Sequence, residues 1–268
     1  MNPNHYQRDA CLPRTKRTRR RRTVGSLRRL CLVVAFLAAC CSCQPHGTEP
    51  PANSAEPATA TLQGIVRLAG SAIPVAVRVE NSTDPQVCGR VRSIDNLMVS
   101  PGTRGIANVI VRLKNVPRDK IPAVAPSRLI LDNMDCQFRP RVSVMTVGGT
   151  IDATNSDPIL HTTHLYGAEE VNIALPFKGV SIPTTVNKPG MIIAKCDIHG
   201  WMQAYIQVDD HPFHAVTEGT GRFHISDIPP GTYDLVTWHE ILGERQMTIS
   251  IRSGSAERIE IEYSQKVN

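Results

Sequence analysis

The stretch from 191 to 208 constrains the fold most, because it predicts two β-strands joined by a tight loop. β-Branched and aromatic residues stand on both sides of the loop, and Gly200 lies within it, a composition that favours an antiparallel hairpin. The loop also carries Cys196, His199 and Met202. A thiol, an imidazole and a thioether are therefore expected within reach of one point without any long-range folding.

These side-chain types predict a metal centre. One thiolate, two imidazoles and a weakly bound thioether form the ligand set of blue copper sites. The loop supplies only one imidazole, so a second histidine is needed from elsewhere in the chain. His161 is the natural candidate, because it follows a strand-like run at 147–155 and a polar turn at 156–158.

Two motifs together resemble a known family. His161 preceded by Asn155-Ser-Asp-Pro-Ile-Leu, with the later run Cys196-x-x-His199-x-x-Met202, resembles the type 1 copper site of cupredoxins, the plastocyanin- and amicyanin-like family. The resemblance covers roughly residues 127–209. It implies a Greek-key β-sandwich with one copper ion, two equatorial histidines, an equatorial cysteine and an axial methionine. Thr162 departs from the asparagine common in the family, so we expect weaker pinning of one ligand loop to the other.

Simpler interpretations of the same residues remain open. A cysteine between strands is often a small buried hydrophobic residue, and a single loop histidine is often solvated. Zinc also binds cysteine and histidine, but it has no use for a thioether. The ligand set could also be vestigial. The four donor types together, in a strand–loop–strand setting, favour copper.

The first 39 residues predict an export signal. A basic run from Arg14 to Arg22 precedes a short apolar run from Leu30 to Ala39, too short for a membrane span. The run ends in Leu-Ala-Ala-Cys40, which resembles the cleavage and lipidation site of bacterial lipoproteins. An ordinary signal peptide is the alternative. We expect lipidation at Cys40, a flexible tether over 40–61, and an exported lipoprotein facing the periplasm or cell surface, with the outer membrane favoured.

The net charge of +6 gives a misleading impression of the mature protein. Residues 1–39 hold 10 of the 30 Lys and Arg side chains and only Asp9 among the acidic ones, so the remainder has 20 basic and 23 acidic side chains, a net charge of −3. No basic surface of the kind that binds phosphate backbones is expected, and nucleic acid is not a predicted partner.

A second, smaller β-sandwich is predicted from the rest of the chain. The segment 217–235, with its Pro229-Pro230-Gly231 turn, resembles the carboxypeptidase regulatory-like, transthyretin-like module. About four strands over 210–264 are too few to close a sandwich. We therefore expect 62–118 and 210–264 to form one interrupted domain around the copper domain. Three sequential β units are the alternative. Nothing in 62–118 indicates a functional site.

Two further structural expectations concern the folded regions. Cysteine counting predicts a disulfide between Cys88 and Cys136, because unpaired thiols are a liability in an exported protein. Two free thiols, or a redox-active Cys136, are the alternatives. The runs 138–147 and 150–155 are predicted to form a hairpin at Gly148-Gly149.

The sequence as a whole therefore predicts an all-β, membrane-tethered copper protein that transfers single electrons to a redox partner in the envelope. Apolar Ile159, Leu160, Ile198 and Trp201 beside the ligand loops would exclude water and form a docking patch. The alternatives are copper capture or delivery, with a copper donor as partner, and a β-sandwich interaction module. An enzyme is not expected, because neither a Gly-x-Ser-x-Gly nor a His-Glu-x-x-His motif occurs.

Overall fold

The computed structural model describes residues 58–71 and 74–264, and the predicted all-β class is confirmed there. The two helices in this part of the chain are short, α1 (Pro85–Cys88) and the 3₁₀ helix η1 (Arg118–Lys120). Neither is long or apolar enough to cross a bilayer. The predicted export signal, the lipidated Cys40 and most of the tether lie outside the described residues and stay predictions.

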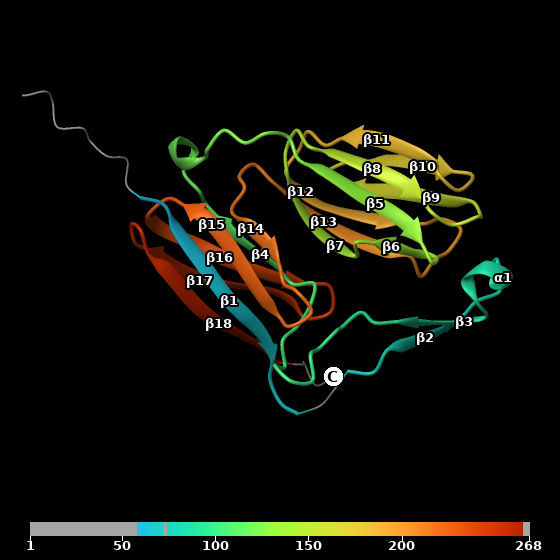
Figure 1. The fold of residues 1–268 in the computed structure, drawn as a ribbon, viewed down its shortest axis with the longest axis horizontal. Coiled ribbons are helices and arrows are strands. Elements are labelled where there is room, and N and C mark those ends of the chain that lie inside the picture. The colour runs from blue at the N-terminus through green and yellow to red at the C-terminus, as the bar shows by residue number, and fades with distance from the viewer. Residues whose placement is uncertain (1–57, 72–73, 265–268) are drawn as a thin grey trace, which may run out of the picture. The chain divides into compact units, whose positions relative to one another are not determined.

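Two sheets built from both ends of the described chain share one hydrophobic core (Figure 1). Their orders are β15-β1-β18 and β14-β4-β16-β17, with β1 antiparallel to β15 and parallel to β18. The strands are β1 (Ala60–Leu68), β4 (Ile110–Lys114), β14 (His214–Val216), β15 (Arg222–Ile228), β16 (Gly231–His239), β17 (Gly243–Ile251) and β18 (Ala256–Tyr263). Segments that precede and follow 127–209 in the sequence are thus paired with each other. That they form one interrupted regulatory-like domain stays a prediction.

β1 lies between β15 and β18 and packs closely against both strands. A side chain at Gly64 would place its Cβ 2.5 Å from the Phe223 ring and 2.6 Å from the Ile259 carbonyl oxygen, so only glycine fits between β15 and β18. The strand also begins before the predicted end of the tether at 61. Ala60 pairs with Ile228 and is buried, so its small apolar side chain belongs to the core and not to the tether.

Residues 128–209 form a second pair of sheets around a separate core. One sheet has the order β10-β9-β12-β13-β7 and the other has the order β11-β8-β5-β6. The strands are β5 (Arg128–Met134), β6 (Gln137–Arg139), β7 (Val142–Thr146), β8 (Thr150–Asn155), β9 (His161–Gly167), β10 (Val171–Leu175), β11 (Ser181–Thr185), β12 (Gly190–Lys195) and β13 (Gln203–Asp209). The parallel pairs β5–β8 and β7–β13 show that distant segments close this sandwich.

The predicted hairpin at Gly148-Gly149 is wrong. β7 pairs with β13, whereas β8 pairs with β5 and β11 in the other sheet. The Val147 N–H still bonds the Asp209 carbonyl at 2.9 Å, but the next N–H, of Gly148, bonds the Val186 carbonyl at 2.8 Å. With its φ of +84°, Gly148 turns the chain from one layer to the next. Two glycines that predict a tight turn serve here as a crossover between sheets.

A two-stranded arm, residues 77–94, belongs to neither core sheet. It consists of β2 (Val77–Glu80), α1 and β3 (Val91–Ile94), with β2 and β3 antiparallel. A disulfide joins Cys88 of the arm to Cys136 in the turn between β5 and β6, the pair that cysteine counting predicts. The Arg92 guanidinium also donates to the Cys88 carbonyl at 2.9 Å and to the Asp135 carbonyl at 2.6 Å. The arm is therefore fastened to the second sandwich.

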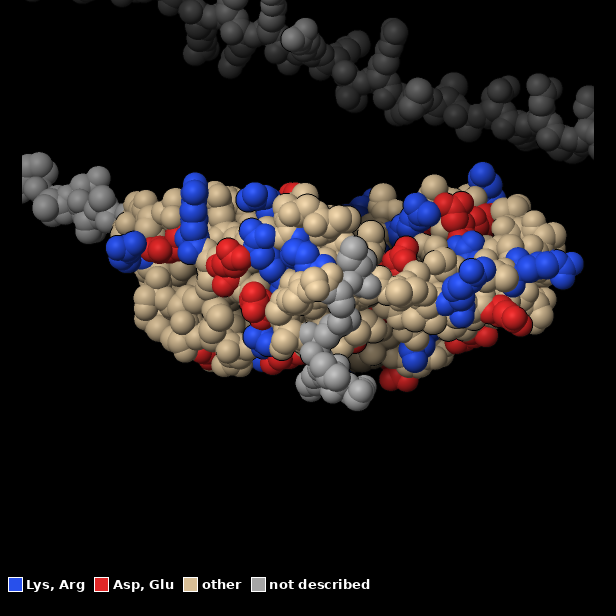
Figure 2. Space-filling view, turned by 90° about the horizontal axis from the view of Figure 1, so that it is seen from below, with Lys and Arg blue, Asp and Glu red and all other residues tan. Residues whose placement is uncertain are grey.

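Acidic and basic side chains are interspersed over the face that Figure 2 shows. Ion pairs of the described residues include Arg67 with Glu260 and Arg141 with Glu240. A face of mixed sign produces no strong field of one sign, so contact with a partner there would depend on shape and apolar area more than on long-range attraction.

Candidate metal centre

His161 is the first residue of β9, and strand pairing brings it to the ligand loop. β9 is antiparallel to β12, with His164 opposite Lys195, so the loop that follows β12 starts beside the beginning of β9. The turn before His161 is shaped by the Asn155 side chain, which donates to the carbonyls of Ile159 at 2.8 Å and Leu175 at 2.9 Å. The second histidine thus arrives through sheet register.

The hairpin that dominates the sequence is present. β12 and β13 pair from Gly190 opposite Val208 to Lys195 opposite Gln203, and the loop between them is closed by two backbone bonds. The Met202 N–H donates to the His199 carbonyl at 2.9 Å, and the Cys196 N–H donates to the Met202 carbonyl at 3.4 Å. A loop this short leaves its side chains little freedom.

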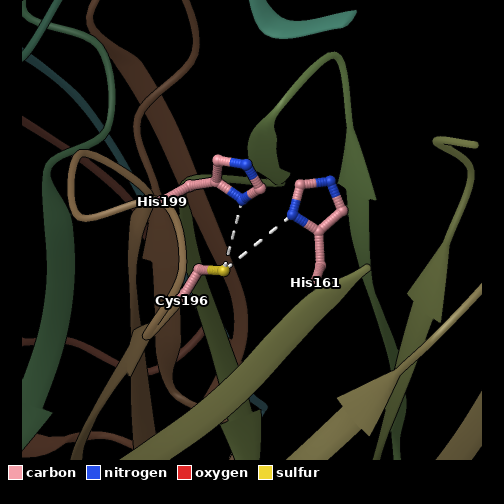
Figure 3. Close-up of side chains that lie close together, drawn as sticks. All are labelled: His161, Cys196 and His199. Atoms are coloured by element: carbon pink, nitrogen blue, oxygen red, sulfur yellow. Dashed lines mark hydrogen bonds between the residues drawn. The ribbon is translucent and has the colours of Figure 1, made fainter. Parts of the chain in front are cut away.

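Three donor atoms meet at one point, as Figure 3 shows. The Cys196 sulfur lies 3.9 Å from Nδ1 of His161 and 3.7 Å from Nδ1 of His199, and the three atoms lie within 4.8 Å of one another. Both imidazoles are fully buried, and Cys196 is 3% exposed. Met202, the predicted axial ligand, is also buried and belongs to the same core as Cys196.

Thr162 contradicts the expectation of weak pinning between the ligand loops. Its backbone N–H donates to the Cys196 sulfur at 3.4 Å. Its hydroxyl oxygen accepts the Asp197 N–H at 2.8 Å. A threonine can hold the two loops together because its hydroxyl is the same kind of acceptor that a longer amide side chain would offer.

Each imidazole has a carboxylate on its outer edge, and neither contact is among the expectations from the sequence. Nε2 of His161 lies 2.9 Å from Oδ2 of Asp157, whose two oxygens also accept the N–H groups of Asp135 at 2.9 Å and Cys136 at 2.8 Å. Only the i, i+4 spacing of Asp157 and His161 offered a signal. Such outer partners fix the tautomer and orientation of ligand histidines.

The carboxylate beside His199 is a correction to the sequence analysis. Oδ2 of Asp84 lies 3.2 Å from Nε2 of His199, although 62–118 was expected to hold no functional residue. Asp84 precedes α1 in the arm. No sequence pattern signals this contact, because the two residues are 115 positions apart.

The proton equilibrium of the metal-free cluster favours the thiolate. Burial alone would raise the pKa of Cys196, but hydrogen bonds from His161, His199 and the Thr162 backbone lower it to about 5. Burial lowers the pKa of His161, yet contacts with Cys196 and Asp157 outweigh it, so the pKa is raised. With a pKa of about 5, the Cys196 thiol is deprotonated near neutral pH. The thiolate is the form that binds metals.

The donor set fits a single metal ion. A metal about 2.0 Å from each nitrogen and about 2.3 Å from the sulfur, at angles of about 120°, leaves about 3.7 Å between sulfur and nitrogen. The observed separations of 3.7 and 3.9 Å match this trigonal arrangement. Buried nitrogen and thiolate donors of this kind suit copper, and the buried Met202 packs in the same core as Cys196.

A second group of potential ligands lies next to this one but does not form a separate site. Cys136, Asp157 and His161 also place one donor atom each within 4.8 Å of one another. The Cys136 sulfur is bonded to Cys88, so it has no thiolate to offer. His164, three residues after His161, is in neither group and instead contacts Asp197 at 3.1 Å.

Sheet order and donor set together define a two-sheet β-sandwich with a buried cluster of one cysteine and two histidines. Solved structures similar to part of this chain include a copper-containing nitrite reductase from Thermus scotoductus, at 23% identity, and a purple cupredoxin from Nitrosopumilus maritimus, at 19%. A third is the Cu(I) form of an M98A mutant of amicyanin, at 20% identity. They cover 35%, 31% and 37% of this chain, with TM-scores of 0.28, 0.27 and 0.27.

The shares of the other chains differ widely. The match spans 27% of the nitrite reductase, 99% of the purple cupredoxin and 98% of the amicyanin mutant. Similarities this low assign no function by themselves. No protein-family model and no curated protein matches the chain.

Proposed function

We propose that this chain is a one-electron carrier with a single type 1 copper ion held by His161, Cys196, His199 and Met202. The observation that carries the proposal is the buried meeting of one sulfur and two Nδ1 atoms within 4.8 Å. Copper, when bound, would supply the Cu(I)/Cu(II) couple. The proposed role is electron transfer rather than catalysis.

The surroundings of the donors support this role. Ile159, Ile198 and Trp201 pack against the core that contains Cys196 and Met202. The Trp201 indole N–H is held by the Cys136 carbonyl at 2.9 Å. These side chains keep water from the donors, and the two-sheet scaffold limits movement of the ligands. A site that rearranges little suits both oxidation states, which is what fast electron exchange requires.

A redox partner protein would dock near the start of β9. Leu160 is 44% exposed and immediately precedes the ligand His161, so an apolar surface lies close to the centre. Apolar side chains of this kind allow a partner to approach and exclude water at the contact. We therefore propose an envelope redox protein as the electron donor or acceptor, in contact with Leu160.

The proposed location is the periplasmic or outer face of a bacterial membrane, with a lipid anchor at Cys40. The disulfide between Cys88 and Cys136 supports an oxidising compartment, because such bonds persist mainly in exported proteins. The basic run, apolar run and Leu-Ala-Ala-Cys40 sequence support export and lipidation. We propose that the second β module is a non-catalytic companion.

Copper delivery is the rival function with the same ligands. A delivery protein must pass its ion to a partner's ligands, which favours donors that a partner can reach. Here both imidazoles have no exposed surface and Cys196 has 3%. Burial therefore favours the exchange of electrons over the exchange of ions.

Optical spectroscopy of the copper-loaded protein tests the proposal. We expect one copper per chain and an intense visible band from thiolate-to-copper charge transfer, with zinc binding giving no colour. Cys196→Ala should abolish the band, because it removes the thiolate. Met202→Leu should retain the band and raise the reduction potential, because it removes only the weak axial donor. A colourless wild-type Cu(II) complex would contradict the proposal.

A further inference from the structure

Asp84 lies at the junction of the arm and the metal centre. Its Oδ2 is 3.2 Å from Nε2 of His199, on the ring edge opposite the Nδ1 that faces the Cys196 sulfur. The His199 side chain has no exposed surface, and the Asp84 side chain is 33% exposed. The arm thus covers the edge of an imidazole that the proposed function makes a copper ligand.

We propose that Asp84 is a positioning residue for the copper centre, which accepts the Nε2–H of His199 and so directs the Nδ1 lone pair toward the metal. The inference rests on the proposed function. Neutral imidazole carries its proton on only one nitrogen, and the acceptor beside that nitrogen decides which one. Carboxylates in contact with ligand histidines hold both the tautomer and the ring orientation.

The other imidazole of the same centre shows the same arrangement. Nδ1 of His161 faces the Cys196 sulfur at 3.9 Å, and its Nε2 contacts Asp157 at 2.9 Å. Both histidines thus present the same nitrogen to the sulfur and the other nitrogen to a carboxylate. The two aspartates come from unrelated parts of the chain, one in the turn before β9 and one in the arm.

The two carboxylates are joined by a continuous set of contacts. Asp157 accepts the Cys136 N–H at 2.8 Å, and Cys136 forms the disulfide with Cys88. The Cys88 N–H in turn donates to the Asp84 carbonyl at 2.9 Å. This connection runs from His161 through Asp157 and the disulfide to Asp84, whose carboxylate contacts His199.

The local backbone also commits Asp84 to this position. Its φ of 47° and ψ of 45° lie in the left-handed region, which aspartate tolerates better than most residues do. Pro85 follows and begins α1, and the Asp84 carbonyl accepts the N–H groups of Val87 at 3.0 Å and Cys88 at 2.9 Å. Within α1 and the turn before it, the backbone is therefore set independently of the histidine contact.

The negative charge of Asp84 has a second consequence. A carboxylate beside a ligand imidazole stabilises the more positive metal ion, so it favours Cu(II) over Cu(I). Asp84→Ala removes both the charge and the acceptor. Asp84→Asn removes the charge but keeps a carbonyl oxygen that can accept the same hydrogen bond. The two variants separate the electrostatic effect from the tautomer effect.

The test compares Asp84→Ala and Asp84→Asn with Asp95→Asn in the full chain. Asp95 is an exposed carboxylate just beyond the arm, whereas the hydrogen bonds of the two histidine side chains go to Asp157, Cys196 and Asp84, so Asp95 controls for loss of one negative charge. Cu(II) and Cu(I) affinities are measured by chelator competition and the potential by voltammetry. Long-range ¹H–¹⁵N NMR of metal-free protein identifies the protonated nitrogen of His199.

For Asp84→Ala we expect Cu(II) affinity to fall about 10- to 100-fold. The potential should rise by about 59 mV for each tenfold by which the Cu(II) loss exceeds the Cu(I) loss. NMR should show a proton on Nε2 of His199 in wild type and Asp84→Asn, and partial loss of that proton in Asp84→Ala, whether or not Nδ1 also donates to the Cys196 thiolate. Asp84→Asn should raise the potential while keeping the tautomer. Asp95→Asn should match wild type throughout.

The inference is overturned if both Asp84 variants keep wild-type affinity, potential and tautomer. If Asp84→Ala does not fold, Asp84→Asn decides: an unchanged potential overturns the charge effect, and an Nε2 of His199 without a proton in the wild-type protein overturns the positioning role. Failure of the proposed function is distinguishable, because the wild type would then lack the blue band. The NMR comparison of metal-free proteins decides the role of Asp84 in that case as well.

Discussion

At the scale of single residues, the centre depends on side chains with several simultaneous contacts. Thr162 bonds both Cys196 and Asp197, and Asp157 accepts three donors at once. Buried polar groups of this kind are stabilising only when every partner is in place. Changes as small as one oxygen to one nitrogen should therefore affect both stability and metal binding.

Asp157→Asn should weaken the centre and the fold together. The amide has one acceptor oxygen and an NH₂ group, so one of the N–H groups of Asp135 and Cys136 or the His161 Nε2–H would lose its acceptor. We expect a loss of about 1–3 kcal/mol in the free energy of unfolding, measured by urea denaturation of metal-free protein. Copper affinity should fall by about tenfold or more.

The control for this change is Asp197→Asn. Asp197 is adjacent to Cys196 but contacts His164 and Asn172 instead of a ligand histidine. The variant removes the same charge close to the centre and leaves the His161 contact intact. Equal losses of affinity in the two variants would show that charge, not the hydrogen bond to His161, is what matters at position 157.

At the scale of elements, the hairpin β12–β13 and the arm contribute in different ways. The hairpin gathers three of the four proposed ligands locally, and β9 adds His161 through its register with β12. The arm supplies no proposed ligand, but it is tied to the turn between β5 and β6 by the Cys88–Cys136 disulfide. Its attachment decides whether Asp84 stays beside His199.

Replacing both Cys88 and Cys136 with serine should destabilise the protein substantially. The disulfide closes a segment with a sequence separation of 48 residues. For a loop of this length, the chain-entropy relation gives about 4 kcal/mol of stabilisation. We expect a loss approaching that value in urea denaturation, together with a rise in potential in the same direction as for Asp84→Ala, because the arm loses its covalent attachment and keeps only hydrogen bonds such as those of Arg92.

Cys196→Ala is the control, since it removes a buried sulfur without opening a disulfide. Its stability loss should be smaller and should not be reproduced by reducing agent. A double-serine variant with wild-type stability would contradict the role given to this bond.

At the scale of the whole molecule, residues before and after 127–209 share one core, and several contacts join this core's strands to the second sandwich. Asp209, at the end of β13, accepts a hydrogen bond from Arg112 of β4 and contacts His214 of β14 at 2.9 Å. Arg141 binds Glu240 through two bonds of 2.6 Å. These pairs hold the ends of the inserted segment.

Asp209→Asn should destabilise the protein in a pH-dependent way. Burial raises the pKa of Asp209, but the contacts with His214 and Arg112 lower it by more than burial raises it. The pKa of Asp209 therefore lies below its usual range. A depressed carboxyl pKa contributes stability that is present above the unfolded-state pKa and is lost as pH falls through the folded-state pKa. We expect a loss of about 3 kcal/mol near neutral pH, because the partners of a buried charge are left unpaired.

The difference between wild type and Asp209→Asn should shrink as the pH falls below about 4. Denaturation curves across this range measure it, and Asp210→Asn, an exposed neighbour, is the matched control. A difference that stays constant into acid would show that packing at position 209, and not its charge, is responsible.

The sequence alone determined the features that depend on short spacing. It predicted the hairpin from alternating apolar residues and the ligand types from the run Cys196-x-x-His199-x-x-Met202, because both involve residues a few positions apart. Cysteine counting identified the pair that the structure joins, since few thiols remained to choose from. All-β character followed from many short strand-like runs.

The tertiary structure alone decided the features that join distant segments. It set the crossover at Gly148, where a predicted hairpin became a passage between sheets, and it placed Asp84 against His199 across 115 positions of sequence. A local pattern contains the preference of each residue but not which distant backbone will satisfy its hydrogen bonds. Those partners are chosen only when the sheets pack and bury the polar groups between them.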